Sequence, residues 1–567
     1  MDSVTLTASK LRVGVLLDSG RVPAWIAQIL NLIQASEHSE LVLFVIGTSP
    51  DNPAESIAST PSGTPVQTLR KVVRSLLLSF NRRWVEMPSS LPSALTCDGI
   101  EPAFSGVPQI NVLPSLTAQS DCFNNDTIAA IRSHDLDVLL YFGGPDLRGA
   151  VLTVARYGVW SYQHGDNRIN RGGPPGFWEV MQLWPEIGCT LQVLGEDVDN
   201  RLVLARSSTA MVPESLAETN DNAYWKAVFL VPRQLRLLHG KGAERFFAEA
   251  RNAEPDPQFY SRRLYASPSN REIAALVASK FWRKLRLRLG HEFGFDQWIL
   301  MWHVADDFSS ALWRYQRVLP PKDRFWADPF VMQRGARYYV FFEEFPFARQ
   351  KGHISVIEVD AHGKPGSAQT ALVADHHLSY PFVFEHDGQT YMIPESRAAN
   401  CIALYRCIEF PLRWEKLMNL MDGVAALDTT LYFRDGRWWM FTNLVQSRAG
   451  SNSDELHVFF APKFATNQWT PHPMNPVVCD VRRARSAGRL FERNGRLYRP
   501  SQDCGQRYGW GLNLNVIERL NEIEYAERLV TKAEPAWAND VLAIHTYNSA
   551  GRLHVVDAQI RRQRHRD

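Results

Sequence analysis

The first 162 residues alternate between short apolar runs and amphipathic segments. Leu11–Leu17 and Leu41–Ile46 are apolar almost throughout, which is typical of strands buried on both faces of a parallel sheet. Between them, Ala24–Ala35 places its large apolar residues on one side of a helix. The same reading predicts further helices over Leu69–Phe80, Thr127–His134 and Val151–Ala155, and strands over Leu136–Phe142 and Tyr157–Tyr162. This alternation predicts a doubly wound α/β sheet with helices on both faces.

The segment that follows has no strand-like alternation. Helices are predicted over Tyr224–Leu238, Ala243–Ala253 and Asn270–Leu289. The last of these ends in the basic stretch Lys280–Arg288, which has Phe281 and Trp282 among its cations. Such a stretch either contacts a membrane surface or polyanion, or packs its apolar residues on a neighbouring domain while its cations stay solvated. We favour packing and keep weak membrane-surface contact near residue 285 as the alternative.

From Phe325 onward a different pattern repeats, in which a turn containing glycine precedes a short aromatic or apolar strand. Asp-Gly and Asn-Gly pairs are typical of hairpin turns because such turns require positive φ. The turn glycines recur every 48 to 59 residues, at Gly335, Gly388, Gly436, Gly495 and Gly551. Second hairpins are expected around Ile354–Val359, Ile402–Cys407 and Leu456–Phe460. Five such units predict an all-β five-bladed propeller, whose last blade Gln297–His303 is expected to close.

The predicted elements divide the chain into an α/β domain (1–206), a helical connector (207–295) and the propeller (296–567). The chain has 62 Lys and Arg against 60 Asp and Glu, so its net charge of +2 gives no general attraction for nucleic acid. Its seven cysteines form no CxxC pair, which favours free thiols and no zinc site. The N-terminus lacks a signal-peptide pattern, and no apolar run approaches the ~20 residues of a membrane span. We therefore expect a cytoplasmic protein.

The segment Tyr162–Glu179 is the strongest candidate for chemistry in the α/β domain. It is rich in Gly and Pro, and it directly follows a predicted strand. Loops held at strand ends commonly carry functional residues, and ligands of such sheets bind beyond the carboxyl ends of the strands. His164, Gly143 and Gly144 are all expected at those ends.

The order of conspicuous residues here resembles that of the folate-dependent formyltransferases. The resemblance covers roughly Leu11–Arg206 and rests on His164, Arg171-Gly172, Pro174-Pro175, Gly188-Cys189-Thr190 and Asp199. It implies a formyl transfer from 10-formyltetrahydrofolate to an amine. His164 would stabilise the oxyanion, an effect worth ~3–4 kcal/mol for one good donor, and Asp199 would orient His164 and accept a proton. By the same resemblance Gly143, Gly144 and Asn200 would bind the folate, and Arg171, Gly172 and Glu179 the substrate.

The chain departs from the formyltransferase pattern at two places. The family has Asn two residues before the histidine, where this chain has Tyr162. The family's Asp-x-Gly is replaced by Asp199-Asn200-Arg201, without the glycine that lets a loop approach a ligand closely. These departures favour an alternative in which the domain is catalytically silent and the protein binds carbohydrate.

Polar residues at the predicted blade strands should converge in the propeller. Asp328, Asp428 and His545 precede the turns, and the strand ends after the turns carry Glu343-Glu344, Glu395, Asn443, Gln502-Asp503 and Asp557. Convergent carboxylates are also what glycoside hydrolysis requires. The residues that we expect to bind a ligand are Asp328, Glu344, Glu395, Asp428, Arg499, Asp503 and His545. Hydrolysis by the carboxylates is an alternative. A third interpretation is purely structural: the polar residues hold the blades together through buried hydrogen bonds.

The C-terminal half also resembles the N-terminal domain of plant glucosamine inositolphosphorylceramide transferases, which is itself similar to glycosidase propellers. The runs FWADPF, HHLSYPFVFE, YMIPES, FPLRW, RPSQDC and IHTY carry this resemblance. Together the two resemblances imply a formyltransferase acting on an amino sugar or glycoconjugate precursor that the propeller holds.

Overall fold

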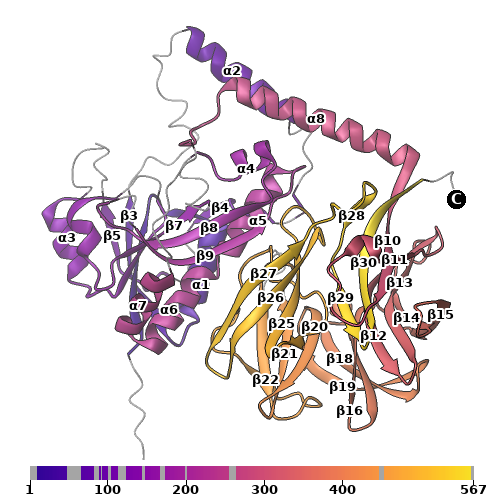
Figure 1. Ribbon diagram of the computed structural model, residues 1–567. Coiled ribbons are helices and arrows are strands. Elements are labelled where there is room, and N and C mark those ends of the chain that lie inside the picture. The colour runs from indigo at the N-terminus through magenta and orange to yellow at the C-terminus, as the bar shows by residue number, and fades with distance from the viewer. Residues whose placement is uncertain are drawn as a thin grey trace, which may run out of the picture. The chain divides into compact units, whose positions relative to one another are not determined.

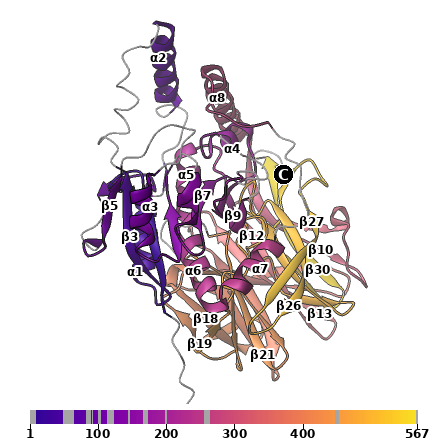
Figure 2. The ribbon, with the colours of Figure 1, turned by 90° about the vertical axis from the view of Figure 1, so that its left-hand side faces the viewer.

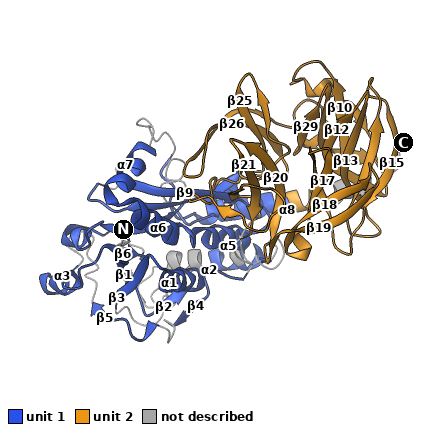
Figure 3. Ribbon diagram, turned by 90° about the horizontal axis from the view of Figure 1, so that it is seen from below, with its two compact units in different colours: residues 1–282 blue, residues 283–567 orange. Residues whose placement is uncertain are grey.

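The computed structural model describes residues 9–47, 65–81, 89–90, 92–99, 104–112, 123–143, 147–165, 173–197, 201–253, 263–445 and 452–563. The chain forms two compact units, Met1–Trp282 and Arg283–Asp567 (Figure 3). The boundary lies within the helix α8 (Asn270–Phe293). Each unit has its own hydrophobic core and is considered separately.

Unit 1 is built on a mixed sheet, which among the described residues has seven strands in the order β5-β3-β1-β6-β7-β8-β9 (Figure 1). The strands β1, β3, β5, β6 and β7 run parallel, whereas β8 and β9 are antiparallel to their neighbours. Their bounds are Leu11–Leu17 (β1), Ser39–Gly47 (β3), Gln109–Val112 (β5), Val138–Tyr141 (β6), Val159–His164 (β7), Glu186–Val193 (β8) and Leu202–Ala210 (β9). Separately, β2 (Arg21–Pro23) pairs antiparallel with β4 (Cys97–Gly99), which is distant in the sequence. The antiparallel strands β8 and β9 at one edge of the large sheet were not predicted.

Helices cover both faces of this sheet, as the sequence predicts. On one face, α1 (Ala24–Gln34), α6 (Leu230–Lys241) and α7 (Ala243–Ala253) pack against alternate β1 residues such as Val13 and Val15. On the other face, α3 (Asn125–Arg132) and the short 3₁₀ helix η3 (Gly149–Thr153) pack against Leu16. This alternation follows from the two-residue period of a strand.

The helices of the segment 207–295 contribute to unit 1. The single helix expected over 224–238 is two helices, because α5 (Leu216–Ala227) ends before α6 begins at Leu230. Ala227, Val228 and Leu235 are buried in the same core as α1. The remaining helices are α2 (Pro65–Phe80) and α4 (Phe177–Gln182), and no helix among the described residues is both long and apolar enough to cross a membrane.

Unit 2 is the predicted propeller, and its described residues form five sheets. We number the blades along the chain, from blade 1 to blade 5. Blade 1 is β12–β15 (Arg324–Arg334, Arg337–Pro346, His353–Val359, Pro365–Leu372) and blade 2 is β16–β19 (Ser379–His386, Gln389–Glu395, Cys401–Glu409, Arg413–Asp422). Blade 3 is β20–β23 (Ala426–Arg434, Arg437–Leu444, Leu456–Ala461, Thr470–Pro471) and blade 4 is β24–β27 (Phe491–Arg493, Arg496–Asp503, Gly511–Leu520, Tyr525–Ala533). Blade 5 joins β10 (Gly294–Val304) and β11 (Gln316–Val318) to β28 (Val541–Ala543), β29 (Tyr547–Ala550) and β30 (Leu553–Gln563).

Blade 5 closes the ring by pairing the two ends of unit 2. The strand β10 lies antiparallel to β30 over eleven consecutive pairs, from Gly294 with Gln563 to Val304 with Leu553. The expected closing role of Gln297–His303 is therefore confirmed. A continuous ladder of this length joins the first and last strands of the propeller and leaves neither as a free edge.

The predicted turns join the first two strands of blades 1 to 4, and in blade 5 the turn joins β29 to β30. Asp387, Asp435 and Asn494 adopt positive φ in these turns, as do the five turn glycines. The third strands β14, β18 and β22 also lie where second hairpins were expected. Local turn chemistry thus sets the repeat of the propeller.

Candidate functional site

One buried polar residue from each blade takes part in contacts that cross between blades. These are Asp328, Tyr380, Asp428, Arg485 and His545. In blades 1 to 3 the residue sits in a bulge of the innermost strand, where Asp328, Tyr380 and Asp428 have φ of 53°, 43° and 51°. Non-glycine residues in this region are strained, so the surrounding contacts must hold them there.

Contacts between blades connect these residues into one cluster. The Oδ2 atom of Asp328 accepts a hydrogen bond of 3.3 Å from the backbone N–H of Tyr380. The Tyr380 hydroxyl accepts one of 2.7 Å from the N–H of Gly488 in blade 4. These two bonds link blades 1, 2 and 4. The side chains of Asp328 and Tyr380 therefore point toward other blades. We call the five residues, with Glu343, Glu395, Gln502 and Asp557, the axial cluster.

Arg485 is the central cation of the axial cluster. Its Nε lies 2.6 Å from Oδ2 of Asp428, and its Nη2 lies 3.9 Å from Oε2 of Glu395. Gln502 donates to the same Asp428 oxygen at 3.2 Å. Although burial opposes the charge, Asp428 raises the pKa of Arg485 well above its usual value. The guanidinium therefore holds two carboxyl groups from neighbouring blades in place.

His545 forms a second acid–base pair on the other side of the cluster. Its Nδ1 lies 2.7 Å from Oδ2 of Asp557, and its Nε2 lies 3.6 Å from Oδ1 of Asp328. The ring of Trp298 stacks on it at 4.1 Å between centroids. Burial lowers the pKa of His545, but the carboxylates of Asp557 and Asp328 outweigh burial and raise it. The imidazole is thus fixed by Asp557 and presents Nε2 toward Asp328.

Several carboxyl groups in the cluster bind a proton more tightly than free carboxyl groups do. Burial, reinforced by the nearby Asp428 and Asp557, raises the pKa of Asp328 to about 6 against the opposing effect of His545. Burial and neighbouring carboxylates also raise the pKa values of Glu343 and Glu395 well above the usual range. A protonated carboxyl can both donate and accept a hydrogen bond. The cluster can therefore exchange protons and bind hydroxyl groups.

Three of these residues offer a set of atoms suited to a metal ion. Ligand atoms of Asp328, His545 and Asp557 lie within 4.8 Å of one another, and all three residues are buried. Asp557 already accepts hydrogen bonds from the backbone N–H groups of Asp328 and Thr546, at 2.8 and 2.9 Å. Both Asp557 carboxylate oxygens thus already accept hydrogen bonds from the protein, so these three residues alone do not indicate a metal site.

The sequence identifies part of this cluster correctly and misplaces the rest. Asp328, Glu395, Asp428 and His545 are brought together as expected. Glu344 instead faces the flank of blade 1, where it binds Arg324 at 2.8 Å and the Ser355 hydroxyl at 2.6 Å, and its neighbour Glu343 belongs to the cluster. Strand alternation sends these two adjacent side chains to opposite faces.

Arg499 and Asp503 also lie apart from the axial cluster. Arg499 is fully buried against Glu527, with two contacts of 2.7 Å, so it has a structural partner within blade 4. Asp503 accepts a hydrogen bond from the N–H of Gly505 at 3.0 Å, which ends the strand β25.

Sequence reasoning missed Tyr380, Arg485 and Tyr508. Comparison of the runs ADPF and SYPF could have identified Tyr380 as the blade 2 counterpart of Asp328. Tyr508 is 48% exposed, yet its ring lies edge-on to His545 at 5.5 Å and beneath the Arg485 guanidinium at 4.7 Å. It therefore connects the axial cluster to the surface.

In unit 1, His164 occupies the predicted place at the carboxyl end of β7. Aromatic rings surround it: the Tyr224 centroid is 3.9 Å away, that of Trp25 is 5.1 Å away, and Tyr162 is stacked at 6.0 Å. Burial lowers the pKa of His164 to about 3. The imidazole is therefore neutral at physiological pH and can act only as a neutral N–H donor or an acceptor.

The residues next to His164 have structural partners. The Tyr162 hydroxyl donates to the carbonyl of Ala227 at 2.8 Å and accepts from the N–H of Val231 at 3.2 Å. It therefore ties β7 to the junction of α5 and α6 rather than supplying the amide donor of the formyltransferase pattern. The Cys189 thiol lies 3.9 Å from Nδ1 of His164, and burial raises its pKa, so it is no thiolate nucleophile.

The remaining predicted residues of unit 1 give a mixed result. Gly143 follows β6, and a Cβ there would come within 2.4 Å of Asp18 Oδ1 and the Tyr141 hydroxyl, so a larger residue would have to displace these side-chain atoms. Glu179 is buried in α4 and does not face an open loop. Gly144, Arg171, Gly172, Asp199 and Asn200 lie outside the described residues.

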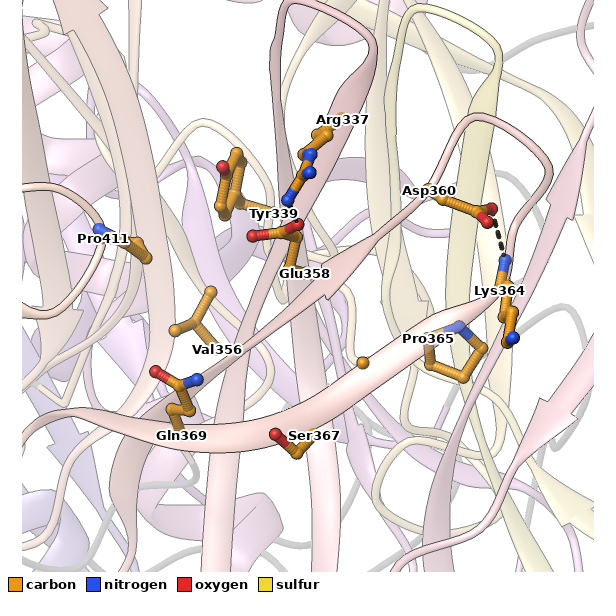
Figure 4. Close-up of a pocket in the computed structure, with 11 residues that line it drawn as sticks. Arg337, Tyr339, Val356, Glu358, Asp360, Lys364, Pro365, Ser367, Gln369 and Pro411 are labelled. Atoms are coloured by element: carbon orange, nitrogen blue, oxygen red, sulfur yellow. Dashed lines mark hydrogen bonds and ion pairs between the residues drawn. The ribbon is translucent and has the colours of Figure 1, made fainter.

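A groove of about 430 Å³ lies on blade 1, separate from these residues (Figure 4). Arg337 and Glu358 form an ion pair within it, and Asp360 accepts the backbone N–H of Lys364 at 2.9 Å. Because the Arg337 and Glu358 charges are already paired, this groove is a weaker candidate than the axial cluster.

Comparisons with known proteins support the interpretation of the propeller. Residues 302–563 match the family model described as "Glucosamine inositolphosphorylceramide transferase 1, N-terminal". The chain is 33% identical over 229 residues to glucosamine inositolphosphorylceramide transferase 1 of Oryza sativa subsp. japonica, covering 40% of this chain and 30% of that protein. For the Arabidopsis thaliana protein of the same name the identity is 34% over 206 residues, covering 36% and 27%. The chain thus spans less than a third of the length of these relatives.

The chain also has distant likenesses to solved structures. A family 117 glycoside hydrolase of Zobellia galactanivorans has a TM-score of 0.32 at 9% identity, covering 47% of this chain and 90% of that one. Glycinamide ribonucleotide transformylase 1 of Symbiobacterium toebii has a TM-score of 0.29 at 12% identity, covering 42% and 92%. Likenesses this distant say nothing about activity, and the formyltransferase resemblance stays a prediction. The segment 302–563, in contrast, is similar to the N-terminal part of glucosamine inositolphosphorylceramide transferases.

Proposed function

We propose that the propeller recognises the sugar part of a glycoconjugate at the axial cluster. The observation that carries this proposal is the convergence of one polar residue from every blade, with strained backbone at Asp328, Tyr380 and Asp428. Strain of this kind is retained where the surrounding structure enforces it, and it is concentrated at functional sites.

The chemistry of the cluster suits a polyhydroxylated ligand. Glu343 and Glu395, whose pKa values are raised well above the usual range, can donate to one hydroxyl oxygen and accept from another, while Asp328 can accept. Arg485 adds a fixed cationic donor, and the exposed Tyr508 ring offers an apolar face beside them. Small-molecule sites commonly combine a few convergent polar groups with an aromatic surface.

The names of the relatives suggest which sugars to test. Glucosamine and inositol are therefore the first probes, with glucose as a neutral comparison. Calorimetric titration of the full chain should show binding that Glu395→Gln or Tyr508→Ala weakens about tenfold or more, which corresponds to about 1.4 kcal/mol. Asp503→Asn is the matched control, because this residue ends the same blade strand as Gln502 but lies outside the cluster. Equal affinity in Glu395→Gln and the parent protein would contradict the proposal.

A second candidate function is formyl transfer in unit 1. The observation that favours it is the neutral imidazole of His164 at the carboxyl end of a central strand. In such a reaction the amine nitrogen bonds to the formyl carbon, the bond from that carbon to the donor nitrogen breaks, and overall one amine proton moves to the donor nitrogen. A neutral N–H at His164 could stabilise charge on the formyl oxygen.

The described residues fit 10-formyltetrahydrofolate only in part. His164 is suitably placed, but Tyr162 is engaged with the backbone of α5 and α6 and supplies no donor. We assign Asp199 the role of proton acceptor by resemblance alone. His164→Gln and Asp199→Asn should each abolish folate-dependent formylation of an amino sugar, and unchanged turnover in both variants would exclude this candidate. The sugar-binding titration is independent of the outcome.

A further inference from the structure

The helix α2 of unit 1 and the helix α8, which runs from unit 1 into unit 2, carry apolar side chains that face solvent. We propose that these two helices form a docking surface for an anionic lipid membrane. The surface comprises Val72, Val73, Leu76 and Phe80 of α2 together with Phe281 and Trp282 of α8. It is separate from both sites considered above and does not depend on their function.

The two helices pack together through a different set of residues. Leu77 of α2 packs against a buried group that includes Ile273, Leu276 and Val277 of α8. The guanidinium of Arg74 donates to the carbonyl of Pro268, just before α8, at 3.2 Å. Figures 1 and 2 both show α2 next to α8 at one end of unit 1. The exposed apolar residues therefore take no part in the packing of α2 on α8 that these contacts describe.

The exposed residues form a regular pattern. Val72, Leu76 and Phe80 follow one another at intervals of four, so they line one face of α2, and they are 50%, 65% and 46% exposed. On α8, Phe281 and Trp282 are 46% and 59% exposed. Of the nine large apolar side chains exposed in the described part of unit 1, six belong to these two helices. Scattered exposed apolar residues are ordinary, but a concentration like this marks an interaction surface.

The positive charge of the two helices indicates an anionic partner. The sequence of α2 contains Arg70, Lys71 and Arg74 and no acidic residue. The sequence of α8 contains six basic residues and two acidic ones, and four of its cations follow Trp282 within Arg283–Arg288, whereas Lys280 is buried. The whole chain carries a net charge of only +2, so positive charge is concentrated here.

An anionic membrane satisfies both features at once. Apolar side chains bordered by Lys and Arg insert at the boundary between headgroups and acyl chains, while the cations contact lipid phosphates. A second copy of the chain would bring two positively charged surfaces together, which is unfavourable. The geometry therefore points to peripheral binding of the helix pair.

Vesicle flotation with the full chain tests this proposal. The protein should float with vesicles of phosphatidylglycerol and phosphatidylcholine, and far less with pure phosphatidylcholine or at high salt, because salt screens the electrostatic attraction. The double variant Leu76→Glu/Trp282→Glu should reduce the bound fraction at least tenfold, since it replaces two inserted apolar side chains with charges.

The control is Leu95→Glu, which introduces the same charge at a residue that is 44% exposed in unit 1 but lies outside both helices. It should float like the parent protein, and circular dichroism should show that all variants are folded. Equal flotation of the double variant and the parent would overturn the proposal. So would self-association of the parent through this surface without vesicle binding, detected by light scattering.

Discussion

The Nε atom of Arg485 lies 2.6 Å from Oδ2 of Asp428, and the two residues come from neighbouring blades of the propeller. Both are almost completely buried. An ion pair in such surroundings gains little over apolar packing, but removal of one partner leaves a charge without compensation. The pair therefore fixes the relative position of blades 3 and 4 at the centre of the proposed sugar site.

Loss of Arg485 should destabilise the propeller strongly. Arg485→Met would leave Asp428 buried without its cation, and we expect the free energy of unfolding to fall by about 3–5 kcal/mol. Urea denaturation followed by circular dichroism measures this change. The double variant Arg485→Met/Asp428→Asn should recover a large part of the loss, because the uncompensated charge is gone. A double variant as unstable as Arg485→Met alone would show that the ion pair is not the cause.

The stability of the propeller should also depend on pH, because the Asp328 carboxyl group titrates. The pKa of Asp328 is about 6 in the folded protein against 3.8 for the free group, so the folded state binds the proton more tightly than the unfolded state. Its contribution to stability is therefore full below pH 3.8 and is lost as the pH rises through about 6. The difference corresponds to roughly 3 kcal/mol.

Asp328→Asn should remove this contribution. Between about pH 4 and pH 6 the variant should lose less stability with rising pH than the parent, which denaturant titrations at several pH values would measure. The same slope in both proteins would show that Asp328 does not bind the proton.

The sequence predicts the repeat of the propeller better than its centre. Asp-Gly and Asn-Gly turns are local, since the positive φ of Asp387 or Asn494 is a preference of the residue itself. Tyrosine has no such preference, so the positive φ of Tyr380 is not local. It is imposed by contacts between blades, such as the bond from the N–H of Tyr380 to Asp328, which join residues far apart in the chain.

Prediction from the sequence is limited in a related way in the α/β unit. The apolar runs identify the central strands, and β1 has the predicted bounds. The helix expected over 224–238 is divided because Ala227, Val228 and Leu230 all enter the same core at the junction of α5 and α6. A helical period does not reveal that junction, which depends on the Tyr162 hydroxyl bonding to Ala227 and Val231.

Unit 1 should be sensitive to acid through His164. The pKa of His164 is about 3 in the folded protein against 6.5 for the free group, so the unfolded state binds the proton more tightly. Its contribution to stability is present above pH 6.5 and is lost as the pH falls toward 3, by up to a few kcal/mol. His164→Phe keeps an aromatic ring among Trp25 and Tyr224 but cannot be protonated. We expect it to unfold at lower pH than the parent, as monitored by tryptophan fluorescence, and earlier acid unfolding would contradict this account.

The two adjacent glutamates of blade 1 allow structural and binding roles to be separated. Burial raises the pKa of Glu344, but hydrogen bonds from His353 and Arg324 outweigh burial and hold it well below the usual range. Glu344→Gln would weaken several charge-assisted bonds, each worth about 1.5–3 kcal/mol, so it should lower the melting temperature clearly. It should not change sugar affinity, because the side chain lies on the flank of the blade.

Glu343→Gln should have the opposite effects. Burial and nearby carboxylates already favour the protonated form of Glu343, so an uncharged amide of similar shape should cost little stability at neutral pH. It removes the proton that the carboxyl group can exchange in the axial cluster, and we expect weaker binding of glucosamine in calorimetric titrations. Because both faces of a propeller strand are buried, the hydrophobic pattern alone cannot decide which glutamate faces the cluster. Weakened binding in Glu344→Gln, with normal binding in Glu343→Gln, would reverse the placement of these two side chains.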